Sequence, residues 1–190
     1  MGPEGLNAFV RRFYPQLDKS ALVIDVRGNG GGNVSPMIIE RLRRQVAMID
    51  LSRNGVPVPN PSDQLVGPKV TLLNEYSASD GDLFPYRFRD AGLGKLVGKR
   101  SWGGVIGITG SLPFMDGGEL NRPEFAKYAK DGSSWIIEGY GVDPDIVVDN
   151  DPAREFRGED QQLDKAIDVI LEELRTRPTS LPAPPPWPVR

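Results

Sequence analysis

The chain has 190 residues, 38% of them hydrophobic, which is enough to bury one core and indicates one main domain. Its 23 basic and 26 acidic residues nearly balance, and its longest basic run is the short segment RLRRQ, so nucleic acid is not an expected partner. The chain contains neither cysteine nor histidine, which excludes disulfides and the usual zinc ligands, and we expect no metal and no cofactor.

Membrane and export signals are also missing from the sequence. The apolar stretches are far shorter than the roughly 20 residues that a membrane span needs. The first residues, MGPEGLNAF, lack the apolar segment of a signal peptide. We therefore expect a soluble, cytoplasmic protein without a membrane partner.

The first part of the chain predicts a strand, a glycine loop and a helix. Residues 5–18 favour a short helix that stops near Pro15, and the apolar run ALVIDV at 21–26 predicts a strand buried on both faces of a sheet. The segment RGNGGGNVSP follows, and its glycines permit positive φ and close backbone approach. Ser35 is expected to cap a helix that continues to Asp50.

A second unit of the same kind follows. Residues 52–68 are rich in turn residues and predict a surface excursion. The run KVTLLNE at 69–75 predicts a strand, NEYSASDGD at 74–82 a serine-rich turn, and residues 79–89 a helix. If the two strands are parallel neighbours, the glycine loop and the serine turn lie together at one edge of the sheet.

The second half of the chain is less regular. Residues 95–107 predict a short strand and a glycine-rich loop, residues 108–141 antiparallel strands, and residues 142–148 a further strand. Apolar residues at helical spacing predict an amphipathic helix over 159–175. Six prolines among residues 175–190 predict an irregular tail.

The two loops together offer a hydroxyl and free backbone N–H groups, which acyl transfer requires. Each loop also has an ordinary explanation. The glycines suit a tight turn, and Ser77 or Ser79 followed by Asp80 and Asp82 suits the start of a helix. A nucleotide site is disfavoured because GNGGGN lacks the Lys-Ser/Thr ending of a P-loop. Composition and spacing leave catalysis and a purely structural role both open.

Three motifs in order resemble those of the tail-specific, or C-terminal processing, serine proteases. They are DVRGNGGG, NEYSASDGD followed by LFPYRF, and WIIEGYGVDPD, and the likeness is greatest to the tricorn proteases. The resemblance runs from about residue 9 to residue 175. It implies a catalytic α/β subdomain over residues 1–176 and a proline-rich tail over 177–190. The implied fold is a curved mixed sheet with flanking helices, a ββα-type fold related to the crotonase and Clp protease group.

The resemblance also implies roles for individual residues. Ser79 corresponds to the nucleophile, and the backbone N–H groups of Gly32 and Asp80 correspond to the oxyanion hole. Gly31 is the competitor for the Gly32 role. Glu138 corresponds to the glutamate that orients a serine-histidine pair.

Asp50 corresponds to an acidic residue that reaches the specificity pocket of a neighbouring subunit. Such a residue favours substrates with Arg or Lys just before the scissile bond. An acid at the C-terminus of a helix opposes the helix dipole, so the expected position of Asp50 also favours a functional role over a structural one.

The chain itself contains no histidine that could take the proton of Ser79. Many bacterial relatives use a lysine, but its position is Gly104 here, which leaves only Lys99 and Lys69 as lesser candidates. Tricorn-type enzymes instead use a serine-histidine pair from an upstream helical subdomain, with a PDZ-like domain between it and this segment, and they assemble as hexamers.

The implied function is a serine peptidase that forms an acyl-enzyme at Ser79. The implied partners are peptide substrates, the upstream regions and further copies of the chain, and the chain alone should be nearly inactive because its base is missing. Two alternatives remain: a non-catalytic binding or scaffold domain of the same fold, and a crotonase-like acyl-CoA enzyme.

Overall fold

The computed structural model describes residues 2–110, 112–177, 180–187 and 189. Our expectations for positions 1, 111, 178–179, 188 and 190, four of them in the proline-rich tail, lie outside the described residues. The helices are α1 (Pro3–Phe13), the short 3-10 helix η1 (Tyr14–Gln16), α2 (Ser35–Leu42), α3 (Asp80–Asp90), α4 (Pro152–Phe156) and α5 (Gln161–Thr176). The strands are β1 (Leu22–Asp25), β2 (Met48–Asp50), β3 (Val58–Asn60), β4 (Lys69–Leu73), β5 (Gly94–Gly98), β6 (Gly107–Thr109), β7 (Arg122–Phe125) and β8 (Ile146–Val147).

Four parallel strands form the central sheet, in the order β1-β4-β5-β8. Leu22 pairs with Lys69 and Asp25 with Leu72, so β1 and β4 are neighbours that end at the same edge. This confirms the predicted arrangement of the two strand–loop–helix units. The sheet is parallel and not mixed, since the antiparallel pairs β2–β3 and β6–β7 form two separate hairpins.

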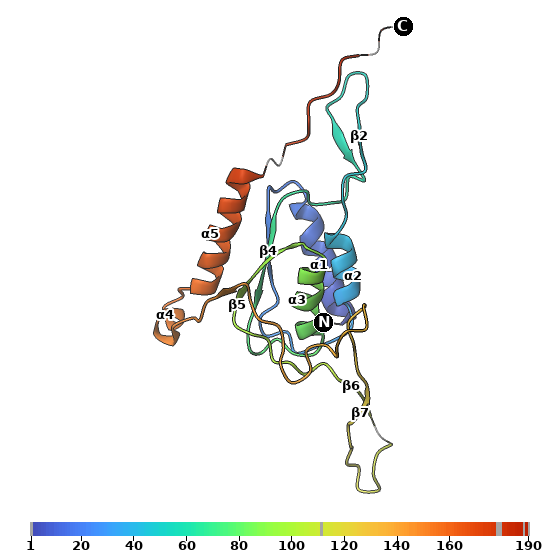
Figure 1. The fold of residues 1–190 in the computed structure, drawn as a ribbon, viewed down its shortest axis with the longest axis vertical. Helices are drawn as coiled ribbons and strands as arrows, with labels where there is room; N and C mark the ends of the chain where they lie inside the picture. The colour runs from blue at the N-terminus through green and yellow to red at the C-terminus, as the bar shows by residue number, and fades with distance from the viewer. Residues whose placement is uncertain (1, 111, 178–179, 188, 190) are drawn as a thin grey trace.

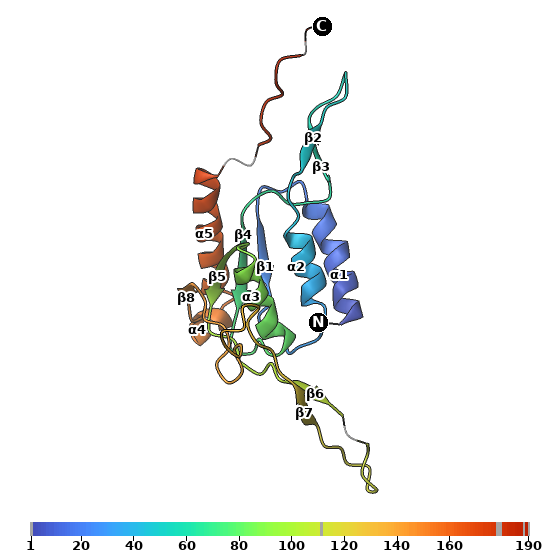
Figure 2. The same ribbon diagram turned by 45° about the vertical axis from the view of Figure 1, so that its right-hand side comes forward.

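Helices cover both faces of this sheet (Figures 1 and 2). α1, α2 and α3 lie on one face, and α5 lies on the other. Strand β4 is buried along its whole length, with Val70 and Leu72 in the cluster around α5. The run at 21–26, predicted to be buried on both faces, instead supplies the edge strand β1. Only Leu22 is buried within β1, because an edge strand has a neighbour on one side only.

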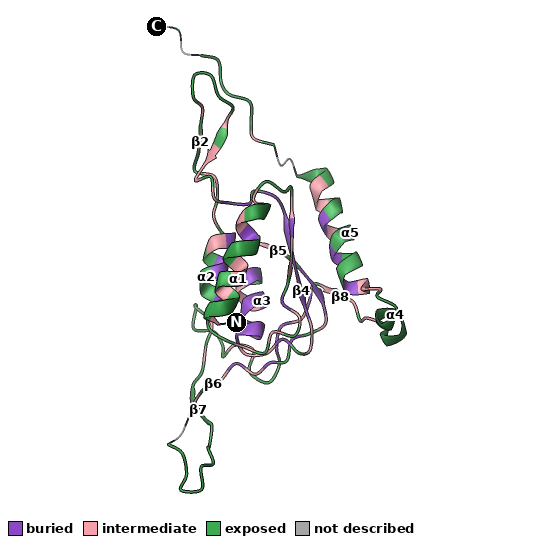
Figure 3. Cartoon of the chain, turned by 180° about the vertical axis from the view of Figure 1, so that it is seen from behind, coloured by how far each residue is buried: buried purple, intermediate pink, exposed green. Residues whose placement is uncertain are grey.

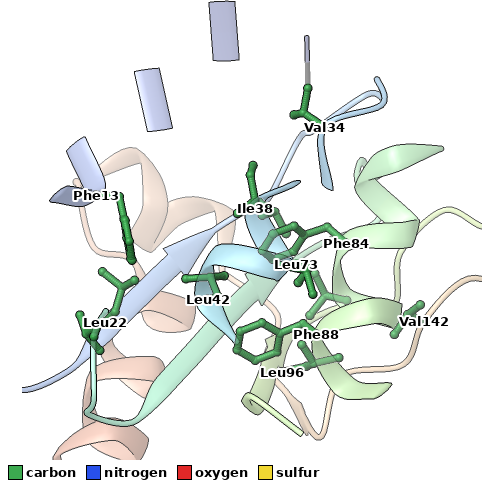
Figure 4. Packing of buried hydrophobic residues seen from close by; sticks show 13 residues of the cluster. Phe13, Leu22, Val34, Ile38, Leu42, Leu73, Phe84, Phe88, Leu96 and Val142 are labelled. Carbon is green, nitrogen blue, oxygen red and sulfur yellow. The ribbon is translucent and has the colours of Figure 1, made fainter. Parts of the chain in front are cut away.

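The larger core cluster holds α3 against the sheet (Figure 4). The rings of Phe84 and Phe88 stack with centroids 6.2 Å apart and belong to the same cluster as Leu73 and Leu96. Both rings are fully buried, and burying such a side chain contributes about 1.5–3 kcal/mol. This packing fixes the start of α3, and with it the serine turn, relative to the ends of the strands.

Two hairpins extend from opposite ends of the molecule, and both are largely exposed (Figures 1 and 3). The pair β2–β3 extends beyond the amino edge of the sheet, and β6–β7 extends beyond the carboxyl edge, where the glycine loop and the serine turn lie. We call residues 107–125 the arm, of which the structure describes 107–110 and 112–125. The described tail residues 180–187 form neither helix nor strand, and several of them line a groove with the β2–β3 hairpin.

Helix α2 is shorter than the sequence predicts. It ends at Leu42 and not at Asp50, because the chain leaves the helix and residues 48–50 form β2. The N–H of Ala47 donates to the carbonyl oxygen of Asn60 at 2.9 Å, and the strand groups that follow pair with β3. The backbone thus exchanges helical hydrogen bonds for hairpin ones. Asp50 is therefore not at a helix C-terminus, and the dipole argument for its function was wrong.

Among the described residues, no helix is both long enough and apolar enough to cross a membrane.

Candidate active site

Ser79 lies at the carboxyl edge of the sheet, where it is the N-cap residue of α3. Its φ of 56° and ψ of −115° place the backbone in a region that residues with a side chain rarely adopt. Strain of this kind costs about 1–3 kcal/mol and persists only where the surrounding structure enforces it. A strained serine between a strand and a helix is also the geometry of a hydrolase nucleophile turn.

The glycine loop lies directly against this serine. A Cβ atom added to Gly31 would come 3.1 Å from the Cβ and 3.4 Å from the Oγ of Ser79. From the other side, a Cβ atom on Gly81 would meet the carbonyl oxygen of Asn29 at 2.0 Å. The same carbonyl accepts the N–H of Ala78 at 2.8 Å. The predicted meeting of the two loops is confirmed, and it depends on glycine at both contacts.

Free backbone N–H groups occur at this contact. The N–H of Gly31 donates to Oδ1 of Asn29 at 3.2 Å and is therefore engaged. Within the described part of the chain, no hydrogen bond takes up the N–H of Gly32 or of Asp80. Such donors at a helix N-terminus suit a developing negative charge. The geometry agrees with the expected oxyanion donors, and their role stays a prediction.

Replacing Gly31 should disturb the serine turn. Gly31 has a φ of 133°, and Gly31→Ala would press a methyl group against Ser79, so we expect a loss of about 1–3 kcal/mol in the free energy of unfolding. The matched control is Gly30→Ala, because Gly30 has open space around its Cβ position and no positive φ. Urea unfolding of both variants measures the difference, and equal effects would contradict the contact.

Asp82 connects the serine turn to the glycine-rich loop after β5. Its carboxylate is fully buried. It accepts the N–H of Ser79 at 2.8 Å, of Gly103 at 2.7 Å and of Gly104 at 3.2 Å. Sequence reasoning identified Asp82 only as a helix-start residue, because nothing in the spacing reveals partners more than 20 positions away. Gly104, the position at which the resemblance noted above places a lysine in bacterial proteases, donates its backbone N–H to Asp82.

Glu138 lies on a turn that is docked on the same loop. One carboxylate oxygen of Glu138 accepts the N–H of Val105 at 2.6 Å and of Ile106 at 2.8 Å. Together with Asp82, this carboxylate ties residues 103–106 to the serine turn on one side and to the Glu138 turn on the other. The structure thus brings Ser79 and Glu138 to the same end of the molecule, linked through one loop.

The residue before Glu138 adopts an unusual conformation. Ile137 has a φ of 48°, which is rare for a β-branched side chain and indicates enforced strain. The N–H of Gly139 donates to the carbonyl oxygen of Gly103 at 2.7 Å and holds the turn in place. Sequence patterns contain no signal for this strain, since an isoleucine in a short apolar run predicts an ordinary strand.

Asp80 uses its buried side chain for a separate purpose. The carboxylate accepts the N–H of Ser35 at 2.9 Å, accepts the Ser35 hydroxyl and pairs with Arg87 at 3.4 Å. Ser35 was expected to cap α2, but the N-cap residue is Val34. The hydroxyl of Ser35 instead joins the first turn of α2 to the first turn of α3.

Arg27 anchors the start of the glycine loop. Its side chain donates two hydrogen bonds to Asp25, two to Asp160 and one to Gln162, at distances of 2.7–3.0 Å. All five guanidinium N–H donors are therefore used. The next N–H, that of Gly28, donates to the Asn74 side chain at 2.9 Å. The glycine loop is thereby fixed to the end of β4 and to the N-terminus of α5.

This ion pair should make stability depend on acid. The Arg27 guanidinium holds the pKa of Asp160 well below its usual range through hydrogen bonds to the charged carboxylate. A lowered pKa stabilises the fold above the ordinary carboxyl pKa of about 4, and the contribution disappears as pH falls below it. Arg27→Met should therefore lower the free energy of unfolding at pH 7. The decrease of this free energy as the pH falls below about 4 should be smaller in the variant than in the wild type.

Urea unfolding between pH 2 and 7, roughly the range over which carboxylates titrate, measures this dependence. The control is Arg157→Met, which removes an exposed partner of Glu159. Parallel curves for wild type and Arg27→Met would contradict the assignment.

The lysines considered as bases are held away from this role. Lys69 begins β4 at the opposite edge of the sheet from Ser79, where it donates to two backbone carbonyls, although burial lowers its pKa. Lys99 is paired with two carboxylates, and the hydrogen bond to Glu75, the larger cause, raises its pKa. Sequence reasoning did not include Lys127 among the lysines that could act as a base. Burial, and to a lesser extent the charge of Arg87, lowers the pKa of Lys127. Its Nζ donates to the Val105 carbonyl at 3.2 Å.

Asp50 lies far from these residues along the fold. Helix α2 starts beside the glycine loop and runs back to the amino edge, so the β2–β3 hairpin is at the other end of the molecule from Ser79 (Figure 2). The Asp50 carboxylate is exposed and accepts a hydrogen bond from Asn60 at 2.9 Å. It cannot contact the serine of its own chain.

Comparison with known proteins decides the family. The sequence profile of peptidase family S41 matches residues 2–148. The chain belongs to peptidase family S41. The matched range contains the glycine loop, the serine turn and the Glu138 turn, and it ends just after β8, the last strand of the sheet. Ser79, Gly31, Asp82 and Glu138 all lie within the matched residues, whereas Asp160 and Gln162, which bind Arg27, lie beyond them.

Among S41 relatives, the chain is 44% identical to the tricorn protease of Thermoplasma acidophilum over 185 residues, which are 97% of this chain and 17% of the relative. It is 40% identical over 174 residues to a tricorn-like protease C-terminal subunit of Sulfurisphaera tokodaii, covering 92% of this chain and 20% of that protein. The crystal structure of the tricorn protease superposes with a TM-score of 0.82 over 92% of this chain and 17% of that one. This S41 chain therefore spans at most a fifth of the length of these relatives.

Proposed function

We propose that this chain is one half of a split serine peptidase site. Ser79 is the nucleophile, the N–H groups of Gly32 and Asp80 form the oxyanion hole, and Glu138 orients a serine-histidine pair supplied by an upstream region with a PDZ-like domain. The observation that carries the proposal is Ser79, strained at a strand–helix turn and packed against Gly31 in a chain without histidine.

The proposed reaction is peptide hydrolysis through an acyl-enzyme. The Ser79 Oγ attacks the scissile carbonyl, and the upstream histidine takes its proton and passes it to the leaving amine. Water then attacks the carbonyl carbon of the ester. The histidine takes the proton of this water and gives it to the Ser79 Oγ, which leaves as the free hydroxyl, and the carboxylic acid product is released. Removing serine or histidine from a triad costs about six orders of magnitude in turnover, so the chain alone is nearly inactive.

Asp50 is proposed to act on a neighbouring copy in a homo-oligomer, a hexamer by likeness to tricorn-type enzymes. The Asp50 side chain is exposed at the end of the molecule opposite the start of α3, where Ser79 lies, which supports a contact with another copy of the chain. In the complete enzyme, Asp50→Ala should lower cleavage after Arg or Lys by about tenfold or more, because a charged pair is lost, and leave cleavage after Phe nearly unchanged. Peptides that differ only at this position measure the ratio, and equal losses would refute the assignment.

A serine-reactive phosphonate tests the split site directly. The chain is treated with the phosphonate alone and in the presence of its upstream region, and the modified residue is found by mass spectrometry. We expect labelling of Ser79 only with the upstream region present. Lys127→Met is the control, because it removes the lysine with a lowered pKa near this end of the molecule.

Other outcomes have definite meanings. Labelling of the isolated wild-type chain that is lost in Lys127→Met would show an internal lysine base and overturn the split site. An absence of labelling in both preparations would favour a non-catalytic binding or scaffold domain of the same fold.

A further inference from the structure

The arm, residues 107–125, carries an unusual concentration of exposed apolar side chains. Leu112 is 89% exposed and Phe114 is 53% exposed, and the side chains of Ile108, Met115, Leu120 and Phe125 are exposed as well. Neither core cluster contains a residue of the arm. An isolated two-stranded hairpin is only marginally stable in water, and apolar patches of this kind mark interaction surfaces.

The base of the arm is connected to the candidate site. The ring of Phe125 lies over Gly107, where an added Cβ would come 1.9 Å from a ring atom, and Lys127 lies over the same ring at 4.7 Å. Lys127 also donates to the Val105 carbonyl, beside the N–H groups that Glu138 holds. A body that covers the arm down to its base therefore reaches the neighbourhood of the Glu138 turn.

We infer that the arm is the docking surface for the base-supplying upstream region. This inference rests on the proposed function, which places a histidine opposite Ser79. A second copy of this chain would cover the apolar side chains equally well, but it brings no histidine and would leave Ser79 without a base. The relatives are long enough to contain such a region, since this chain covers only 17% of the Thermoplasma acidophilum tricorn protease.

The test uses the absence of cysteine, which makes a single introduced thiol a unique label. Leu112→Cys reports on the arm, and Val56→Cys, 75% exposed on the β2–β3 hairpin at the opposite pole, is the matched control. The probe is the Thermoplasma acidophilum tricorn protease without its matched C-terminal part, purified and shown to be folded by circular dichroism. Maleimide labelling rates are measured with and without this probe.

We expect the probe to slow labelling at Leu112→Cys by about tenfold or more and to leave Val56→Cys unchanged. A shortened chain, in which Asn-Gly replaces residues 110–121, should bind the probe at least about tenfold more weakly. Thr109 and Arg122 are direct partners in the hairpin, so a two-residue turn can join them without disturbing the strands. An unchanged melting temperature of the shortened chain shows that the loss is not one of folding.

Three results would overturn the inference. They are failure of the folded probe to bind, binding without protection of Leu112→Cys, and protection of Leu112→Cys in the isolated chain at high concentration, which would indicate self-association. Phosphonate labelling of Ser79 in the same mixtures separates the two proposals. Protection of Leu112→Cys from maleimide without phosphonate labelling of Ser79 supports the docking surface and rejects the proposed chemistry. Phosphonate labelling of Ser79 without protection of Leu112→Cys supports the chemistry and rejects the docking surface.

Discussion

Replacing Ser79 by glycine is expected to abolish turnover in the complete enzyme and to stabilise the fold. The loss of the nucleophile should lower turnover by about six orders of magnitude. Glycine adopts the φ of 56° without strain, and the weaker helix cap costs only a few tenths of a kcal/mol, so the free energy of unfolding should rise by about 1 kcal/mol.

Ser79→Ala is the matched control for this prediction. Alanine removes the hydroxyl but keeps the Cβ atom, so it should lose the same activity without the gain in stability. Peptide turnover in the assembled enzyme and urea unfolding of the chain alone give the two measurements. Equal stabilities of the glycine and alanine variants would show that the backbone at Ser79 is not under strain.

Asp82→Ala should be the most destabilising change near the site. It leaves three N–H groups, those of Ser79, Gly103 and Gly104, without their acceptor at a buried position. An unsatisfied buried donor costs about 1–3 kcal/mol, so a loss of about 3 kcal/mol or more is expected in urea unfolding. The loop at 103–106, whose N–H groups donate to Glu138, also loses its attachment to the serine turn. Phosphonate labelling of Ser79 in the assembled enzyme should therefore slow.

The control for Asp82 is Asp164→Ala, which removes an exposed acid from the first turn of α5. Its effect should stay within about 0.5 kcal/mol, since only the helix dipole is affected. A similar loss in both variants would mean that Asp82 acts through its charge at a helix start and not through the loop it holds.

Regular elements with one strong signal were predictable from the sequence. Apolar spacing predicts a helix over 159–175, and α5 runs from Gln161 to Thr176. Two strand–loop–helix units in series allowed the parallel pairing of β1 and β4, and the structure contains it. In both cases the deciding contacts are local or are fixed by the rules of βα connection.

What could not be predicted depends on partners distant in the sequence. Residues 48–50 continue an apolar pattern, and only their pairing with 58–60 makes them a strand. From the sequence, Asp82 is only an acid at the start of a helix. Its second role, accepting the N–H groups of Gly103 and Gly104, is visible only in the folded chain. The strain at Ile137 likewise comes from the turn that packs on Gly103, which no local preference reveals.

The reversal of the chain along α2 separates the proposed nucleophile Ser79 from the proposed specificity residue Asp50. Neither core cluster, among the described residues, draws a buried side chain from residues 48–60. The hairpin that carries Asp50 can therefore accept substitutions without repacking the sheet that holds Ser79. With the roles proposed for Asp50 and Ser79, substrate preference could change in evolution through the β2–β3 hairpin while the end of the sheet that carries Ser79 stays unchanged.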